Sequence, residues 1–127
     1  MWILRKLLYP LIICCYIMPL QIVECDSWLD YFESDGQAHL GFIVIVRSEY
    51  KVNGKREMIV RHEKVHIEQQ KEVGIIPFYI FYPANMLLQI YRYGDEDKAY
   101  ENNMFEKEAY KAEKELDYRR KMYECWR

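Results

Sequence analysis

The residues best suited to chemistry in this chain are two histidines and a glutamate in the pattern H-E-x-x-H: His62, Glu63 and His66. On an α-helix, positions i and i+4 lie on the same face, so both imidazoles can point at one metal ion. Glu63 follows His62 directly and can reach a water bound to that ion. Zinc-dependent hydrolysis needs two neutral nitrogen ligands, an open coordination position and a carboxylate base. The pattern therefore predicts a zinc site at which Glu63 is the catalytic base.

A third protein ligand is needed, and a candidate lies forty residues beyond His66, where 105–110 reads F-E-K-E-A-Y. Here the chain resembles the gluzincin metallopeptidases, in which a later helix carries a ligand glutamate. One branch of that group has the form E-x-x-A-D, with the first glutamate on zinc. This chain matches it with Glu106 as the ligand and Ala109 as the small residue. The resemblance implies a zinc ion held by His62, His66 and Glu106.

The chain also resembles small bacterial membrane-associated proteins that pair H-E-x-x-H-x-x-Q with F-E-x-E-A-Y, and the likeness covers about 58–118. Gln69 lies three residues after His66 on the same helical face, where it can bond a neighbour of the metal. The E-x-x-A-D branch has an aspartate that resembles a group holding a zinc-bound histidine. This chain has Tyr110 there, an uncharged phenol that would orient a histidine more weakly. Gln69, Glu108 and Tyr110 are thus the candidates for the surroundings of the ligands.

Composition narrows the class of protein. A length of 127 residues allows one domain with a leader or anchor. The net charge of −2 provides no large basic field, so no nucleic-acid partner is expected. Aromatic residues make up 16% of the chain, which suits a membrane–water boundary. The cysteines have no C-x-x-C spacing, and Cys25 and Cys125 could pair if the domain is exported.

The N-terminal segment 1–25 is predicted to be a hydrophobic anchor or a signal sequence. Leu7–Val23 carries no charge over seventeen residues, the lower limit for a membrane span. The residues before Cys25 are not the small ones that a cleavage site requires, which favours a retained anchor over a cleaved signal. Arg5 and Lys6 prefer the cytoplasmic side, so domain 26–127 is expected on the extracytoplasmic side.

The segment between the anchor and the motif predicts a small sheet. Residues 26–39 read as a linker with a helical turn at 28–32, and His39 within it reads as a surface histidine. Gly41–Arg47 is β-branched and aromatic, which predicts a strand. Asn53-Gly54 is a hairpin signal that predicts a short return strand before the motif helix. The strand could hold a peptide substrate by backbone pairing or only cover the helix.

Three helical regions follow. The motif helix is expected at about 57–73, with Gly74 as its C-cap. The uncharged run Val73–Tyr91 is nominally long enough to span a bilayer, but Pro83 interrupts it and predicts two short helices. If this run crossed the membrane once, the histidines and Glu106 would end on opposite sides. A shared metal therefore requires a run that dips in and returns, lies in the interface, or is buried in protein.

A long helix is predicted at about 98–126. Its apolar residues recur at helical spacing, and both Glu106 and Glu108 flank that stripe. Periodicity does not choose between the two glutamates, and the family resemblance selects Glu106. Tyr100 and Tyr110 are candidates to support an oxyanion. Glu113 reads as a solvated glutamate. The stripe consists of Phe105, Ala109, Ala112, Leu116 and Tyr123.

The sequence therefore predicts an α+β, mostly helical, minimal zincin-like domain. A short hairpin would be packed by the H-E-x-x-H helix and a C-terminal helix, behind an N-terminal anchor. The expected function is that of a membrane-associated zinc metallopeptidase that hydrolyses peptide bonds of a peptide or protein substrate. One alternative keeps the metal without catalysis, as a binding or sensing module. Another is an anchored helical protein in which H-E-x-x-H is a coincidence.

Overall fold

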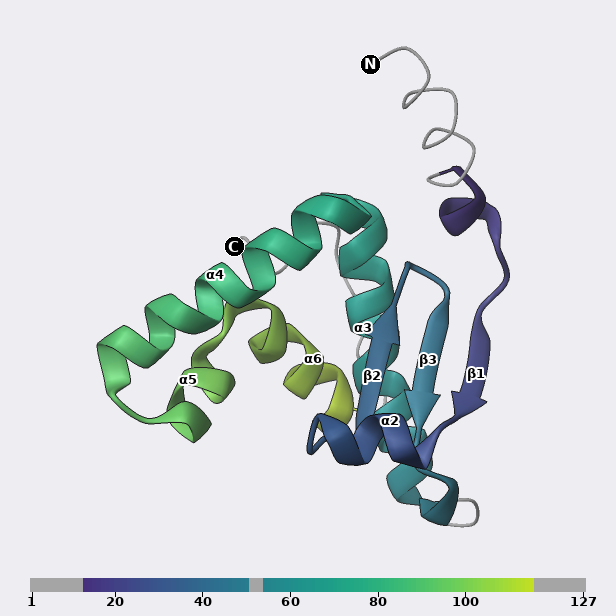
Figure 1. Cartoon of the computed structure of the whole chain (residues 1–127), viewed down its shortest axis with the longest axis horizontal. Helices are drawn as coiled ribbons and strands as arrows, with labels where there is room; N and C mark the ends of the chain where they lie inside the picture. Colours follow the sequence, from purple (N-terminus) through teal and green to yellow (C-terminus); the bar gives the residue numbers. More distant parts are fainter. Residues whose placement is uncertain (1–12, 51–53, 116–127) are drawn as a thin grey trace.

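The computed structural model describes residues 13–50 and 54–115, and the chain is mostly helical with one small sheet, as the sequence predicted (Figure 1). Residues 13–17 are helical and lead into the first strand. In chain order, the elements are β1 (Gln21–Glu24), α2 (Asp26–Tyr31), β2 (Gly36–His39), β3 (Ile43–Val46), the 3₁₀ helix η1 (Ser48–Tyr50), α3 (Gly54–Val73), α4 (Ile75–Tyr93), α5 (Glu96–Asn102) and α6 (Met104–Lys114).

The sheet has the order β1-β3-β2, with β1 parallel and β2 antiparallel to β3. Its central strand β3 is the predicted Ile-Val-Ile-Val segment, whose alternation places Val44 and Val46 on one face. Both valines are fully buried and pack against Ile59 and Ile67 of α3. This contact lays the motif helix along one face of the sheet (Figure 1).

The hairpin lies before β3 rather than after it, so the predicted return strand is wrong. Leu40 and Gly41 both have positive φ angles and turn the chain from β2 into β3. In the described residues between β3 and α3 the chain forms η1 and no strand, and Asn53 lies outside the described residues. The physical reason is that β3 already has a neighbour on each edge, because β1 occupies the second one.

The segment expected to be a linker contains a helix and a strand. The short helix predicted at 28–32 is confirmed as α2, whereas Gly36–His39 forms the edge strand β2. Strand β1 consists of Gln21–Glu24, which the sequence assigned to the end of the hydrophobic segment. Residues 1–12 of that segment lie outside the described residues. The end of the predicted linker and the residues just before it thus build two strands of the sheet that supports the motif helix.

Helix α4 is continuous, so the prediction of two short helices broken near Pro83 is wrong. The start of α6 holds it on both sides of the proline: Asn103 donates to the Tyr82 carbonyl, and the Met104 amide donates to Asn85. Gly74, with φ of 104°, turns the chain between α3 and α4. Within the described ranges no single helix is long and apolar enough to cross a membrane. Helices α3 and α4 meet that criterion only as a pair bent by 116°.

The predicted long C-terminal helix is two helices. The chain breaks at Asn103, which is fully buried and whose side chain accepts a hydrogen bond from the Phe105 amide as the N-cap of α6. Ala109 and Ala112 of the predicted stripe are buried and pack against Val65 of α3. These small residues let α6 lie close to the motif helix. The part of the prediction beyond residue 115 lies outside the described residues.

Candidate metal centre

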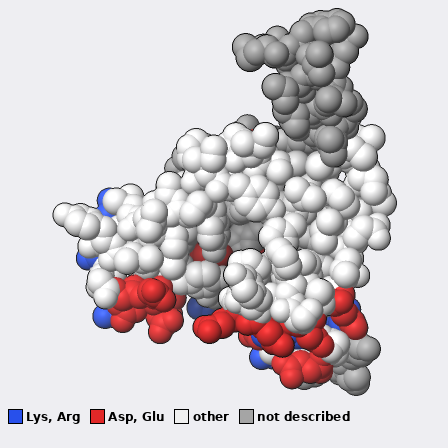
Figure 2. Space-filling view, viewed as in Figure 1, with Lys and Arg blue, Asp and Glu red and all other residues white. Residues whose placement is uncertain are grey.

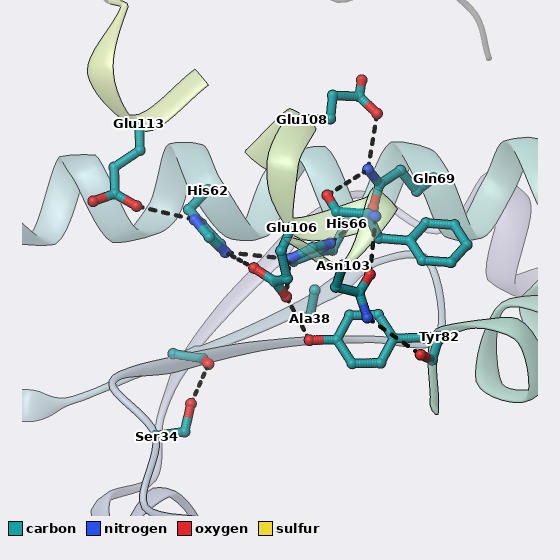
Figure 3. A network of polar contacts seen from close by, with 12 residues as sticks. Ser34, Ala38, His62, His66, Gln69, Tyr82, Asn103, Glu106, Glu108 and Glu113 are labelled. Carbon is teal, nitrogen blue, oxygen red and sulfur yellow. Dashed lines mark hydrogen bonds and ion pairs between the residues drawn. The ribbon is translucent and has the colours of Figure 1, made fainter. Parts of the chain in front are cut away.

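Three buried side chains from α3 and α6 converge on one point (Figure 3). The Nε2 atom of His62 lies 2.9 Å from Glu106 Oε2, and the Nε2 atom of His66 lies 3.1 Å from Glu106 Oε1. The two Nε2 atoms are 3.2 Å apart. The exposed fractions are 7%, 5% and 1% for His62, His66 and Glu106. Within the described part of the chain these three residues are the group that could hold a metal ion.

The other ring nitrogens point outward and fix the orientation of both imidazoles. His62 Nδ1 lies 3.0 Å from Glu113 Oε2, and His66 Nδ1 lies 2.8 Å from Gln69 Oε1. The Gln69 amide nitrogen donates to Phe105 O and to Glu108 Oε2, so its oxygen faces His66. Carboxylate and amide oxygens only accept hydrogen bonds, so each Nδ1 carries the donated proton. With Nδ1 as the donor of each ring, both Nε2 atoms could present lone pairs to a metal ion bound at the centre.

Two such lone pairs and a carboxylate this close together require a positive charge between them. Burial alone would raise the pKa of Glu106, but the charge on His66 and the hydrogen bonds from both imidazoles outweigh it and hold that pKa well below its usual range. For His66 the effect is the reverse. Burial would lower its pKa, but Glu106 raises it to about 9. Both pKa shifts have the same cause, because positive charge beside the Glu106 carboxylate is favourable, and a metal ion at this position would supply such a charge.

Glu63 lies beside this group and faces the same cleft. It is 7% exposed, and burial raises the pKa of its carboxyl against the opposing effect of His66 and His62. A raised pKa suits a group that must accept and return a proton near neutral pH. The structure thus places the predicted base next to the predicted ligands.

The cleft has a volume of about 760 Å³ and runs between the sheet with α2 on one side and α4 to α6 on the other. Figure 2 shows it as a hollow in this face of the molecule. Glu63 and the three convergent side chains line it, together with Tyr82, Tyr100 and Tyr110. Strand β2 forms part of its wall. The buried carboxylates of Glu63 and Glu106 therefore face this cleft.

The three residues expected around the metal ligands, Gln69, Glu108 and Tyr110, make different contacts. Gln69 bonds His66 as predicted, and Glu108, which is 2% exposed, bonds Gln69. Tyr110 meets the His62 ring edge-on, with 5.1 Å between ring centres. The hydrogen bond to that histidine comes instead from Glu113, so the prediction of a solvated Glu113 is wrong.

Two residues that contact the centre were not predicted from the sequence. Glu113 lies seven residues after Glu106, on the same helical face, and this spacing could have identified it. Tyr82 donates a hydrogen bond from its hydroxyl to Glu106 Oε1. Burial and the neighbouring Glu106 raise the pKa of Tyr82, which keeps the phenol protonated as a donor. No signal in the apolar run of α4 marks this tyrosine, because the contact depends on how α4 packs on α6.

His39 was expected to be an isolated surface histidine, but it is partly buried and has two partners. Its Nδ1 lies 2.8 Å from the Tyr79 hydroxyl, and its Nε2 lies 2.9 Å from Gln37 Oε1. It lines the cleft without joining the convergent group. His39 therefore serves as a control for the two histidines of the motif.

Comparisons of the chain with protein-family models, with curated proteins and with solved structures give no match. The function is therefore inferred from the chemistry of the centre and of the cleft around it.

Gly36 of β2 lies against the base, which leads to a prediction about its substitution. A Cβ at this position would lie 2.6 Å from Ile59 Cγ2 and 3.2 Å from Glu63 Oε1, so β2 or α3 must shift. We expect Gly36→Ala to destabilise the protein by about 1–3 kcal/mol, as overpacking commonly does. Chemical denaturation measures this loss. Gly54→Ala is the matched control, since its Cβ meets nothing within 4 Å. Equal stability of the two variants would contradict the close contact.

Proposed function

We propose that the protein is a zinc-dependent metallopeptidase in which His62, His66 and Glu106 hold the metal and Glu63 is the catalytic base. The observation that carries the proposal is the convergence of both Nε2 atoms on one buried carboxylate. Donors bound to a tetrahedral zinc ion at about 2.0–2.1 Å lie roughly 3.3 Å apart. The two nitrogens are 3.2 Å apart, close to that value, and each lies within 3.1 Å of one of the two Glu106 oxygens. Two imidazoles and a carboxylate are a usual donor set for catalytic zinc, which supports this choice of metal.

The chain supplies three ligands, which leaves one position of a tetrahedron for water or substrate. When bound, zinc lowers the pKa of a coordinated water and polarises the peptide carbonyl. Glu63 accepts the proton of the attacking water and returns it to the departing amine. Gln69 and Glu113 hold the imidazoles in the required tautomer. Tyr100 and Tyr110 line the cleft and are the candidates to donate to the developing oxyanion.

The proposed substrate is an extended peptide or protein segment. The edge strand β2 lies in the wall of the cleft, where backbone pairing can align such a segment. The apolar N-terminal segment, with Arg5 and Lys6 near its start, supports membrane association with the domain on the extracytoplasmic side. This location is part of the proposal.

Substitution of the base tests the proposal. Zinc-loaded wild type should cleave quenched fluorogenic peptides, and Glu63→Gln should lower turnover by about 10²–10⁴-fold, the usual contribution of a general base. Zinc content should stay unchanged, because Glu63 is outside the convergent group. Glu68→Gln, on an exposed position of the same helix, is the matched control and should retain activity.

Three outcomes separate the alternatives. Wild type that binds zinc but hydrolyses none of a diverse peptide set would favour a metal-binding or sensing protein over a peptidase. If the wild-type protein binds no zinc, the H-E-x-x-H motif is a coincidence and the protein is not a metalloprotein of this kind. Equal turnover by wild type and Glu63→Gln would remove Glu63 from the mechanism.

A further inference from the structure

Helix α4 buries Ile75, Phe78 and Gln89 but leaves most of its other apolar side chains exposed. Its inner face carries Asn85 and Gln89, which is 7% exposed. Residues at helical spacing on the opposite face are apolar or aromatic and exposed. They form the outer stripe of α4, which we define as Ile76 (56% exposed), Ile80 (59%), Leu87 (67%) and Tyr91 (88%). The stripe runs from Ile76 to Tyr91, nearly the full length of the 19-residue helix and about 24 Å at 1.5 Å per residue.

A contiguous exposed apolar face of this length marks a surface that is covered in use. Four observations on this molecule identify what covers it.

The first observation is the absence of charge. No residue from Val73 to Tyr91 is charged, and Arg92 is the one charged residue of α4. A helix with an apolar outer face and no acidic residue can lie against lipid without burying a charge.

The second observation is the position of the aromatic residues. Phe81, Tyr91 and Tyr93 are exposed on α4 and do not line the cleft. Tyrosine combines an apolar ring with a polar hydroxyl and is enriched at the level of the lipid headgroups. Aromatic residues are enriched at protein–protein interfaces as well, so the choice of lipid over a protein partner rests on the absence of charge and on the neighbouring N-terminal segment.

The third observation is that the apolar N-terminal segment adjoins this helix. The position of a Cβ on Gly41 lies 3.5 Å from the Cys15 carbonyl oxygen and 3.6 Å from Ile75 Cδ1, so residue 15 lies near the first turn of α4. The described part of that segment also exposes apolar side chains, among them Ile13 and Ile17. Figure 1 shows residues 13–17 and the corner between α3 and α4 on the same side of the molecule. The two apolar surfaces are therefore neighbours.

The fourth observation is the distribution of acidic residues. On the face shown in Figure 2, Asp and Glu gather along the edge away from α4, and the part over α4 is almost free of charge. Anionic headgroups would repel an acidic surface and leave the α4 side free to approach.

We propose that the outer stripe of α4 lies in the headgroup and upper acyl region of a lipid bilayer. This contact is separate from the N-terminal segment and does not depend on the zinc chemistry. The inner face of the same helix supplies Phe78 and Tyr82 to the cleft, so the proposed membrane contact places that cleft beside the lipid surface.

A fluorophore on α4 tests the contact in the full chain. The four native cysteines are replaced by serine, and Leu87→Cys is labelled with an environment-sensitive dye. The protein is then reconstituted into phosphatidylcholine–phosphatidylglycerol vesicles with or without lipids that carry brominated acyl chains. We expect a blue-shifted emission that the brominated lipids quench. The matched control, Asp97→Cys, is exposed on α5 and should be neither shifted nor quenched.

A second pair of variants tests the stripe itself. In an otherwise identical chain labelled at position 87, Ile80→Glu should reduce the quenching by brominated lipids at least severalfold. Glu101→Gln, an exposed change on α5, should leave it unaltered. Quenching at position 87 no greater than at position 97 would overturn the proposal. A blue shift without quenching would also overturn it, because the stripe would then be covered by protein, such as a second copy of the chain.

Discussion

Replacing His66 with alanine is expected to abolish stoichiometric zinc binding. His66 contributes one of two imidazole nitrogens to the centre, and its Nε2 lies 3.1 Å from Glu106 Oε1. Removing it leaves one nitrogen and one carboxylate, too few protein ligands for a stable zinc site. His62→Ala should have the same effect. The measurement is zinc per chain by mass spectrometry after dialysis against a moderate chelator, with circular dichroism to verify that each variant is folded.

His39→Ala is the matched control and should keep its zinc. His39 lines the same cleft, but its ring nitrogens contact Tyr79 and Gln37 rather than the centre. Equal zinc loss from His39→Ala and His66→Ala would mean that the motif histidines are not specific ligands.

The second large effect is expected from Glu106, with Glu108 as its comparison. Both carboxylates are on α6, and they are 1% and 2% exposed, so burial does not distinguish them. Their contacts do. Glu106 lies against both imidazoles, whereas Glu108 accepts a hydrogen bond from Gln69, one step away from His66 (Figure 3). Only the first is positioned to bind the metal directly.

Glu106→Gln should therefore lose zinc completely under competition with a moderate chelator. Glu108→Gln changes a residue that contacts Gln69, which in turn contacts His66. Changes at this distance from the metal typically lower the metal affinity by about 10–100-fold. A competition titration with a chromogenic chelator measures both variants. The opposite order would show that α6 presents the other carboxylate to the metal. No difference of either variant from wild type would remove α6 from the site and, with it, the gluzincin-like reading.

The local features of the fold followed from local sequence. The β-branched run of β3 and the uninterrupted helix that carries the motif were both predicted, because propensity and period act over a few residues. The pairing of the H-E-x-x-H histidines with Glu106 was reached only through the resemblance, since helical periodicity placed Glu106 and Glu108 equally. The structure brings Glu106 to the histidines through the packing of Ala109 and Ala112 on α3.

The errors arose where distant parts of the chain decide the outcome. The edge of β3 expected to receive a return strand is taken by β1, which comes from residues 21–24. Pro83 lies inside a continuous helix because α6 holds α4 on both sides of it. The contact of Tyr82 with the centre likewise depends on how α4 packs on α6 and leaves no local pattern in the sequence. Glu113 is different, because its spacing from Glu106 on one helical face was visible in the sequence.

The contact between α3 and α6 has a consequence for the amount of protein in a cell. A shared ion would close a loop of forty residues, from His66 to Glu106, across an interface that contains the buried apolar cluster Val65, Ala109 and Ala112. An ion that binds only the folded chain stabilises it by about 4 kcal/mol at a thousand times its dissociation constant. Newly made chains would then fold and escape proteolysis in proportion to the zinc supply. Zinc starvation would lower the abundance of the protein even in a variant such as Glu63→Gln that has no activity to lose.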